Sequence, residues 1–255
     1  MKICACVKRV PMVGGQIAVT ADGLDVDTTM SGFTVSPHEE CAVEEAVRIA
    51  ERLEGGEVTV LTLGPPEAAS QLRDMLALGA HRGILLRTDS ADPEWGPMAT
   101  AAAIADAVRG ESFDLLLFGN EAADSGGYQV PVRVAHALGL PCVTGIKRLE
   151  VDAGARRVQA ARERGGAEEA FELPLPAVVS VKEGINLPRY PSLPGRLRAK
   201  RATIEEIVPS QTLDRLRKER LRVPAAAAKQ ARLLGTGADA VPALVDLLGE
   251  LGVLP

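Results

Sequence analysis

Aromatic residues are scarce in this chain, which has one Trp, two Tyr and four Phe among 255 residues. The core must therefore be built from Ala, Val, Leu and Ile, as in a buried parallel sheet covered by Ala-rich helices. Apolar residues make up 46% and charged residues 25% of the chain. This is an ordinary composition for a globular protein.

Cysteine is also sparse, and no two of the four cysteines form a CxxC pair. Nothing has the spacing of a zinc or iron–sulfur site, so we predict no metal ligands. Cys4 and Cys6 alternate in a strand-like run and are expected to be small core residues. Any redox chemistry would then need a bound organic cofactor.

Several other features are absent. The net charge is −5 and no basic stripe is interleaved with aromatics, which argues against nucleic-acid binding. No run of about 18 apolar residues occurs, so no membrane span is expected. The N-terminus has neither the apolar segment nor the cleavage site of a signal peptide, and we expect a cytoplasmic location.

Catalytic signatures are missing as well. No Gly-x-Gly-x-x-Gly follows the first strand-like run, and no Walker lysine is present. His38, His81 and His136 fall in a helix start, a helix end and a helix middle, and no Ser–His–Asp or Cys–His set can be assembled. We predict no catalytic residues, and a chain that is not itself an enzyme.

Strand-like runs and helical segments alternate through the first 145 residues, with short loops between them. This alternation predicts an α/β fold, a doubly wound, Rossmann-like parallel sheet with right-handed crossovers. The expected strands are residues 2–7, 57–63, 83–87, 114–118 and 141–145, and the expected helices are 36–53, 66–78, 97–108 and 127–138.

The second part of the chain is less regular. Residues 148–158 and 167–172 are typical of an added hairpin, and residues 176–181 of a further buried strand. The tail from residue 208 is charged, then Ala-rich, and ends in an amphipathic helix over 238–251. It is too poor in apolar residues to form its own core, so we expect it to dock as an extended arm.

The loop over residues 119–129 is the strongest candidate for a ligand site. In a doubly wound sheet, ligands bind beyond the strand ends where the strand order reverses, here expected between this loop and residues 8–15. Ser125-Gly126-Gly127 precedes a helix, whose free N–H groups and dipole attract phosphate. Asp124 could cap that helix or reach a ribose hydroxyl. A Gly-rich helix cap without a ligand is equally compatible with these residues.

The loop over residues 183–195 combines three prolines with Leu187, Tyr190 and Leu193, where a linker would be polar. A stiff loop with exposed apolar side chains suits a docking anchor. A segment that packs on its own core would show the same pattern, so the residues alone leave both interpretations open.

These motifs together resemble the beta subunit of electron transfer flavoproteins along most of the chain. Each match is modest alone, but their order and spacing are specific. The matching pieces are residues 7–11 (VKRVP), 42–46 (AVEEA), 63–65 (LGP), 77–83 (ALGAHRG), 119–121 (GNE) with Asp124, 175–178 (LPAV), and 186–190 (NLPRY) continuing to the basic run at 198–201.

The resemblance implies an adenine-nucleotide-binding domain over residues 1–186, and a recognition loop and partner-docking arm over 187–255. It implies an electron-carrying heterodimer whose alpha subunit holds most of an FAD. The beta subunit would bury an AMP, or a second FAD in an electron-bifurcating branch. Flavin dehydrogenases such as the acyl-CoA dehydrogenases of fatty acid oxidation would deliver electrons, and a quinone oxidoreductase would receive them.

The resemblance also implies which residues bind. The Lys8–Val13 loop would approach the flavin ring, Leu193 would anchor the dehydrogenase with Tyr190 beside it, and the arm would embrace the alpha subunit. Family members often have Asn at position 36 and a Thr-Gly or Val-Gly pair at positions 130 and 131. The implied adenine-nucleotide contacts are Cys6, Val7, Ser36, Leu63, Asp124, Gly127, Tyr128, Gln129 and Val130.

Two other functions compete with this one. A stand-alone nucleotide-binding module of the universal-stress type would share the sheet, but it does not explain the proline-stiffened loop or the long tail. An ATP-pyrophosphatase-type enzyme would need a phosphate loop after the first strand, and the sequence has none there.

Overall fold

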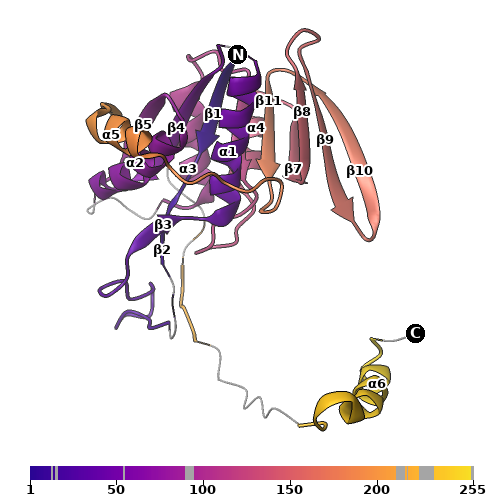
Figure 1. Ribbon diagram of the computed structural model, residues 1–255. Coiled ribbons are helices and arrows are strands. Elements are labelled where there is room, and N and C mark those ends of the chain that lie inside the picture. Colours follow the sequence, from indigo (N-terminus) through magenta and orange to yellow (C-terminus); the bar gives the residue numbers. More distant parts are fainter. Residues whose placement is uncertain are drawn as a thin grey trace.

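A seven-stranded parallel sheet forms the centre of the protein, as the computed structural model shows (Figure 1). The structure describes residues 1–12, 14, 17–53, 55–89, 95–210, 216, 218–223 and 233–253. The strands, in spatial order, are β12 (Ile204–Ile207), β5 (Arg82–Arg87), β4 (Glu57–Gly64), β1 (Lys2–Cys6), β6 (Leu115–Gly119), β11 (Ala177–Val181) and β7 (Cys142–Ile146), and all neighbours are parallel. The predicted doubly wound α/β fold is confirmed.

The strand order reverses between β1 and β6. From β1 the chain steps outward to β4 and β5, and α3 (Pro97–Val108) then carries it back across to β6 on the other side of β1. The carboxyl ends of β1 and β6 therefore lie side by side while their following loops diverge. This is the crevice that doubly wound sheets use for ligands.

Helices cover both faces of the sheet. On one face α1 (Pro37–Arg52) and α2 (Ala69–Leu78) pack over Ile3 and Ala5 of β1. On the other face α3 and α4 (Val130–Leu138) pack over Cys4 and Cys6. Successive residues of a strand point to opposite faces, so β1 contributes to both cores. Cys4 and Cys6 are buried as predicted.

The start of α1 agrees with its sequence. Ser36 is the N-cap, Pro37 occupies the first turn, and the Glu39 side chain completes a capping box. Pro is favoured at a first helical position because its missing N–H would have no partner there. The short 3₁₀ turn η1 (Pro66–Ala68) similarly leads into α2.

The added hairpin is a three-stranded antiparallel meander. β8 (Arg148–Asp152), β9 (Arg157–Arg164) and β10 (Ala167–Pro174) lie in the order β10-β9-β8. The prediction of one continuous strand over 148–158 was wrong, because Asp152 turns the chain by accepting the Ala155 N–H at 2.8 Å. The second turn uses Gly165 and Gly166, both at positive φ.

A smaller β element extends from the carboxyl end of β1. β2 (Arg9–Pro11) pairs antiparallel with β3 (Phe33–Val35), and a single bridge joins Val19 to Val26 on either side of Asp22-Gly23. Arg9 lies over the Phe33 ring, 3.2 Å from its centroid.

The segment after Asn186 packs against the α/β fold of its own chain. α5 (Leu193–Arg201) starts at Ser192, whose hydroxyl accepts the Gly195 N–H at 3.1 Å. Gly195 lies so close to α2 that a Cβ there would be 2.6 Å from the Ala77 carbonyl oxygen. β12 then joins the sheet beside β5. Neither α5 nor β12 was predicted.

The predicted C-terminal helix is present as η2 (Gly237–Ala240) followed by α6 (Val241–Glu250). Figure 1 shows α6 well away from the sheet, and none of its residues, all of them described, is buried. The predicted Ala-rich segment at 225–228 lies outside the described residues. Among the helices that the structure describes, none is long and apolar enough to cross a bilayer.

Candidate functional site

A cavity of about 450 Å³ lies at the point where the strand order reverses. Its walls come from the loops after β1, β4 and β6 and from the first turns of α3 and α4. Seven of the nine residues predicted to contact a nucleotide line it, namely Cys6, Val7, Leu63, Gly127, Tyr128, Gln129 and Val130.

The other two predicted residues, Ser36 and Asp124, are not part of the cavity lining. Ser36 is fully buried, and its hydroxyl accepts the Ala123 N–H at 2.9 Å, which ties the loop after β6 to the start of α1. Asp124 pairs with Lys8, with 2.7 Å between a carboxylate oxygen and Nζ. Both therefore shape the loop around the cavity.

The ion pair between Lys8 and Asp124 links the two loops across the switch point. Lys8 follows β1 and lines the cavity, whereas Asp124 belongs to the loop after β6. Both side chains are partly exposed, at 44% and 26%, so the pair contributes at most about 1 kcal/mol to folding. Its main effect is to hold the loops near each other.

One end of the cavity is rich in free backbone donors. Gly126 and Tyr128 have φ of 54° and 55°, so the chain turns twice before α4 begins at Val130. These turns explain why the helix starts later than the predicted Gly127. Within the described part of the chain, the N–H groups of residues 127–130 donate to no acceptor. Such a row of N–H groups at a helix start attracts anions.

Glu39 is a cavity residue that the sequence reasoning missed. Its carboxylate accepts the Ser36 N–H at 3.2 Å inside the capping box. Burial raises the pKa of Glu39 to about 8, although hydrogen bonds from the Lys8 and Ser36 backbones and the charge of Lys8 oppose the shift. A carboxyl group that is largely neutral near pH 7 does not repel a bound anion.

Trp95 was also missed. It lines the cavity next to the first turn of α3, and its carbonyl accepts the Thr100 hydroxyl at 3.3 Å. Its indole Nε1 is buried and has no hydrogen-bond partner in the structure as described. An unmet buried donor costs roughly 1–3 kcal/mol, which a ligand acceptor could offset. The available signal was that this sole Trp stands directly before a Gly-Pro helix start.

The predicted docking residues lie on the surface. Tyr190 is 95% exposed and Leu193 72% exposed, with Leu187 nearby in the chain at 83%. Leu193 is the first residue of α5 and so is held by a helix start rather than by a loop. In the loop expected to face a flavin, Met12 is 57% exposed, and Val13 lies outside the described residues.

Comparison with known proteins gives the family. The family model described as "Electron transfer flavoprotein domain" matches residues 24–212. The chain is 37% identical to electron transfer flavoprotein subunit beta of Syntrophomonas wolfei, with 80% of this chain and 78% of that protein covered. It is 34% identical to the Homo sapiens beta subunit, with 82% of each covered.

The chain belongs to the beta-subunit family of electron transfer flavoproteins. A further relative, the Bacillus subtilis beta subunit, is 36% identical over 69% of this chain and 67% of that protein. The family resemblance drawn from the sequence is confirmed, and it is favoured over the universal-stress module. Electron transfer flavoproteins are flavin-containing electron carriers, and the name of a beta subunit implies a partner subunit.

Proposed function

We propose that the chain is the beta subunit of a heterodimer and pairs with an alpha subunit that holds most of an FAD. The complex would act in the cytoplasm. It would take electrons from flavin dehydrogenases, such as acyl-CoA dehydrogenases of fatty acid oxidation, and pass them to a quinone oxidoreductase. Family membership over most of the chain supports this proposal. The chain would act as an electron-carrier subunit without catalytic residues of its own.

The cavity at the switch point would hold an adenine nucleotide in this function, and we propose AMP. The observation that carries this is the row of free N–H groups at residues 127–130, next to a cavity with predominantly apolar walls. A volume of about 450 Å³ is at the smaller end of the usual range of roughly 300–1,000 Å³ for ligand pockets. This size favours a mononucleotide over the second FAD of a bifurcating member.

Each part of the cavity would serve one part of the ligand. The amides of residues 127–130 would bind the phosphate, and Lys8 would balance its charge. Cys6, Val7 and Leu63 would contact the base, with the Trp95 indole N–H as a donor. Redox chemistry in the complex would come from the flavin. This chain would orient the nucleotide and exclude water from it.

The apolar residues Tyr190 and Leu193 would dock the dehydrogenase. α6, with its exposed Val241, Leu244 and Val245, would bind the alpha subunit. Amphipathic helices without a buried face usually find a partner groove.

Extraction of bound nucleotides from the purified complex tests the proposal. The chain is co-expressed with the product of its genomic neighbour, the complex is denatured, and released nucleotides are quantified by chromatography. One FAD and one AMP per heterodimer are expected. Two FAD and no AMP would show a bifurcating member, and a colourless, monomeric chain that ignores its neighbour would refute the assignment.

Two variants locate the site within the same assay. Asp124→Ala should lower the AMP content, because it frees the loop that carries the phosphate donors. Asp152→Ala, which removes a surface carboxylate of the β8–β9 turn, is the control and should retain AMP. Full AMP retention by Asp124→Ala would show that the nucleotide is held elsewhere.

A further inference from the structure

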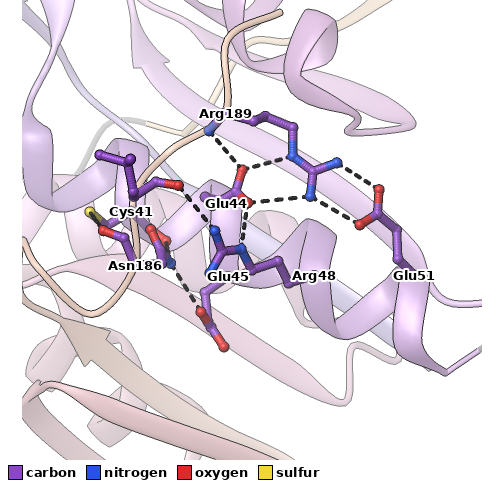
Figure 2. Close-up of polar contacts among 8 residues, drawn as sticks. Cys41, Glu44, Glu45, Arg48, Glu51, Asn186 and Arg189 are labelled. Atoms are coloured by element: carbon purple, nitrogen blue, oxygen red, sulfur yellow. Dashed lines mark hydrogen bonds and ion pairs between the residues drawn. The ribbon is translucent and has the colours of Figure 1, made fainter.

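Helix α1 holds the chain just before the exposed Tyr190. Arg189 donates to Glu44 from its backbone N–H at 3.2 Å and from Nε at 2.9 Å, and its Nη2 lies 3.3 Å from the other Glu44 oxygen (Figure 2). Its Nη1 and Nη2 donate to the two Glu51 oxygens at 2.6 Å and 2.9 Å. The Arg189 guanidinium is thus bound by two carboxylates of one helix.

Glu44 is the buried centre of this arrangement. Its side chain is 1% exposed, and Arg48 binds it from the other side in an i,i+4 pair. Burial opposes its charge, but hydrogen bonds from Arg189 and Arg48 outweigh that effect and keep the pKa of Glu44 below its ordinary value. The carboxylate is therefore charged near pH 7 and held between two guanidinium groups.

A second set of contacts fixes the preceding residues. The Asn186 side-chain amide donates to the Cys41 carbonyl and to Glu45, both at 3.0 Å (Figure 2). Arg48 Nη2 donates to the Leu187 carbonyl at 3.1 Å. Side chains of α1 thus bind the segment at three successive places. We call residues 44, 48, 51 and 189 the arginine clamp.

The far end of the segment is fixed as well. Ser192 caps α5, and Gly195 seats that helix against α2. Only Tyr190 and Pro191 separate the arginine clamp from the Ser192 cap, and prolines at 188, 191 and 194 restrict the backbone further. Tyr190 and Leu193 are therefore exposed apolar side chains on a backbone held at both ends.

We propose that the arginine clamp is a positioning device that presents Tyr190 and Leu193 in one orientation to a docking protein. The inference rests on the proposed docking function. Replacing a buried ion pair by apolar residues often preserves or raises stability, so stability alone does not explain this network. A pre-ordered surface lowers the entropy cost of association, which gives the charges a function in recognition.

Trypsin reports directly on the arginine clamp. The bond after Arg189 is a trypsin site beside a fully exposed Tyr190, yet the Arg189 side chain is bound by two carboxylates. We expect slow cleavage there in the co-purified complex. Glu51→Gln, at an exposed position that folding tolerates, should speed cleavage after Arg189 about fivefold. The reason is that losing one ion pair makes local opening of this segment easier.

Two further variants and two controls complete the proteolysis test. Arg189→Lys keeps the charge and the cleavage site but loses the planar guanidinium that binds two carboxylates at once. It should therefore speed cleavage after residue 189 as Glu51→Gln does. Glu44→Gln should have a larger effect. Glu57→Gln, at an exposed glutamate at the start of β4, should change nothing, and cleavage after the exposed Arg201 serves as the internal reference. Unchanged cleavage in both Glu51→Gln and Arg189→Lys would overturn the inference.

Kinetics then connect the arginine clamp to docking. The complex is reduced by an acyl-CoA dehydrogenase preloaded with its acyl-CoA, at increasing dehydrogenase concentration. Glu51→Gln and Arg189→Lys should raise the KM for the dehydrogenase about fivefold, equivalent to about 1 kcal/mol of ordering cost, with kcat and FAD content unchanged.

Leu193→Ala separates the two proposals. If Leu193→Ala raises KM while the clamp variants leave it unchanged, the positioning inference is wrong and the docking function stands. If Leu193→Ala also leaves KM unchanged, this surface does not dock the dehydrogenase, and both proposals for it fall.

Discussion

Trp95 places an unsatisfied indole N–H beside the cavity, and a single substitution isolates that atom. Trp95→Phe keeps an aromatic ring but removes the donor. We expect AMP to bind about fivefold more weakly, the effect of losing one hydrogen bond of about 1 kcal/mol. Calorimetric titration of AMP into the nucleotide-free complex measures this change. Tyr190→Phe, outside the cavity lining, is the control, and equal affinity in both variants would show that the indole N–H does not contact the nucleotide.

Glu39 makes stability depend on pH in a direction unusual for a carboxylate. Its pKa is about 8 in the folded chain and about 4.5 when unfolded. The folding stability that the neutral Glu39 carboxyl contributes is therefore fully present below about pH 4.5. It is lost as the pH rises through 8, and the free energy of unfolding falls by up to about 1.4 kcal/mol per pH unit on the way. Glu39→Gln should remove this slope, because the amide stays neutral and still accepts the Ser36 N–H.

Urea unfolding of the wild-type chain and Glu39→Gln at pH 5 to 8.5 tests this expectation. The free energy of unfolding of the wild type should fall relative to the variant across that window. A constant difference would mean that Lys8, which favours the charged form, keeps Glu39 ionised throughout.

At the residue scale, the sequence carried one local signal for the candidate site, the glycines at 126 and 127 before a helix start. Cys6 and Val7 were predicted only from the family resemblance, and the structure places both in the cavity lining. Trp95 and Glu39 come into the cavity only through the packing of α3 and α1 against the sheet. That packing depends on contacts between distant segments, so no nearby pattern indicated Glu39, and the one local signal for Trp95 was its place before the Gly-Pro helix start.

At the scale of elements, Gly119 allows β6 and α1 to meet. A Cβ at this position would lie 2.6 Å from the Glu39 Cγ and 2.9 Å from the Glu39 backbone nitrogen. Gly119→Ala should therefore push the start of α1 away from β6 and destabilise the fold by about 1–3 kcal/mol. Gly110→Ala is the matched control, since a Cβ there lies within 4 Å of no atom in the described part of the chain.

Chemical denaturation of both glycine variants measures the difference between them. A loss of stability in Gly119→Ala close to that in Gly110→Ala would show that the helix start adjusts without strain. Since Gly119 also lines the cavity, a fall in AMP content of the co-purified complex should accompany the loss of stability.

The regular βα alternation made most elements predictable, and the misses have physical causes. β12 reads Ile-Glu-Glu-Ile, which lacks the apolar run of a buried strand because it is an edge strand. Glu205 in that strand binds Arg82 of β5, a pairing between residues far apart in the chain. The position of β11 between β6 and β7 was not predicted for the same reason. The spatial order of strands depends on packing between distant segments, which a pattern along the sequence does not show.

At the scale of the whole molecule, α6 offers an apolar surface to another chain. Val241, Leu244 and Val245 are about half exposed, and no residue of this helix is buried. Deleting residues 233–255 should leave the thermal unfolding temperature of the isolated chain within about 2 °C, because little buried surface is lost. The same deletion should greatly reduce co-purification with the alpha subunit.

Point variants in α6 refine this test. Leu244→Ser should weaken co-purification, whereas Asp246→Ser, two residues along the same helix, should not. If the deletion lowers the unfolding temperature by many degrees, α6 packs on its own chain, and the proposed contact with the alpha subunit would be wrong.

The placement of β11 has a consequence for synthesis on the ribosome. β7 ends at Ile146, but the strand that separates it from β6 begins only at Ala177. Until that later segment emerges, the nascent chain exposes an apolar strand edge on β6 that can pair with other chains. Translation pauses or truncations between these two positions would therefore yield an aggregation-prone fragment. Once the meander of β8, β9 and β10 has been synthesised, β11 follows it and covers the exposed edge of β6.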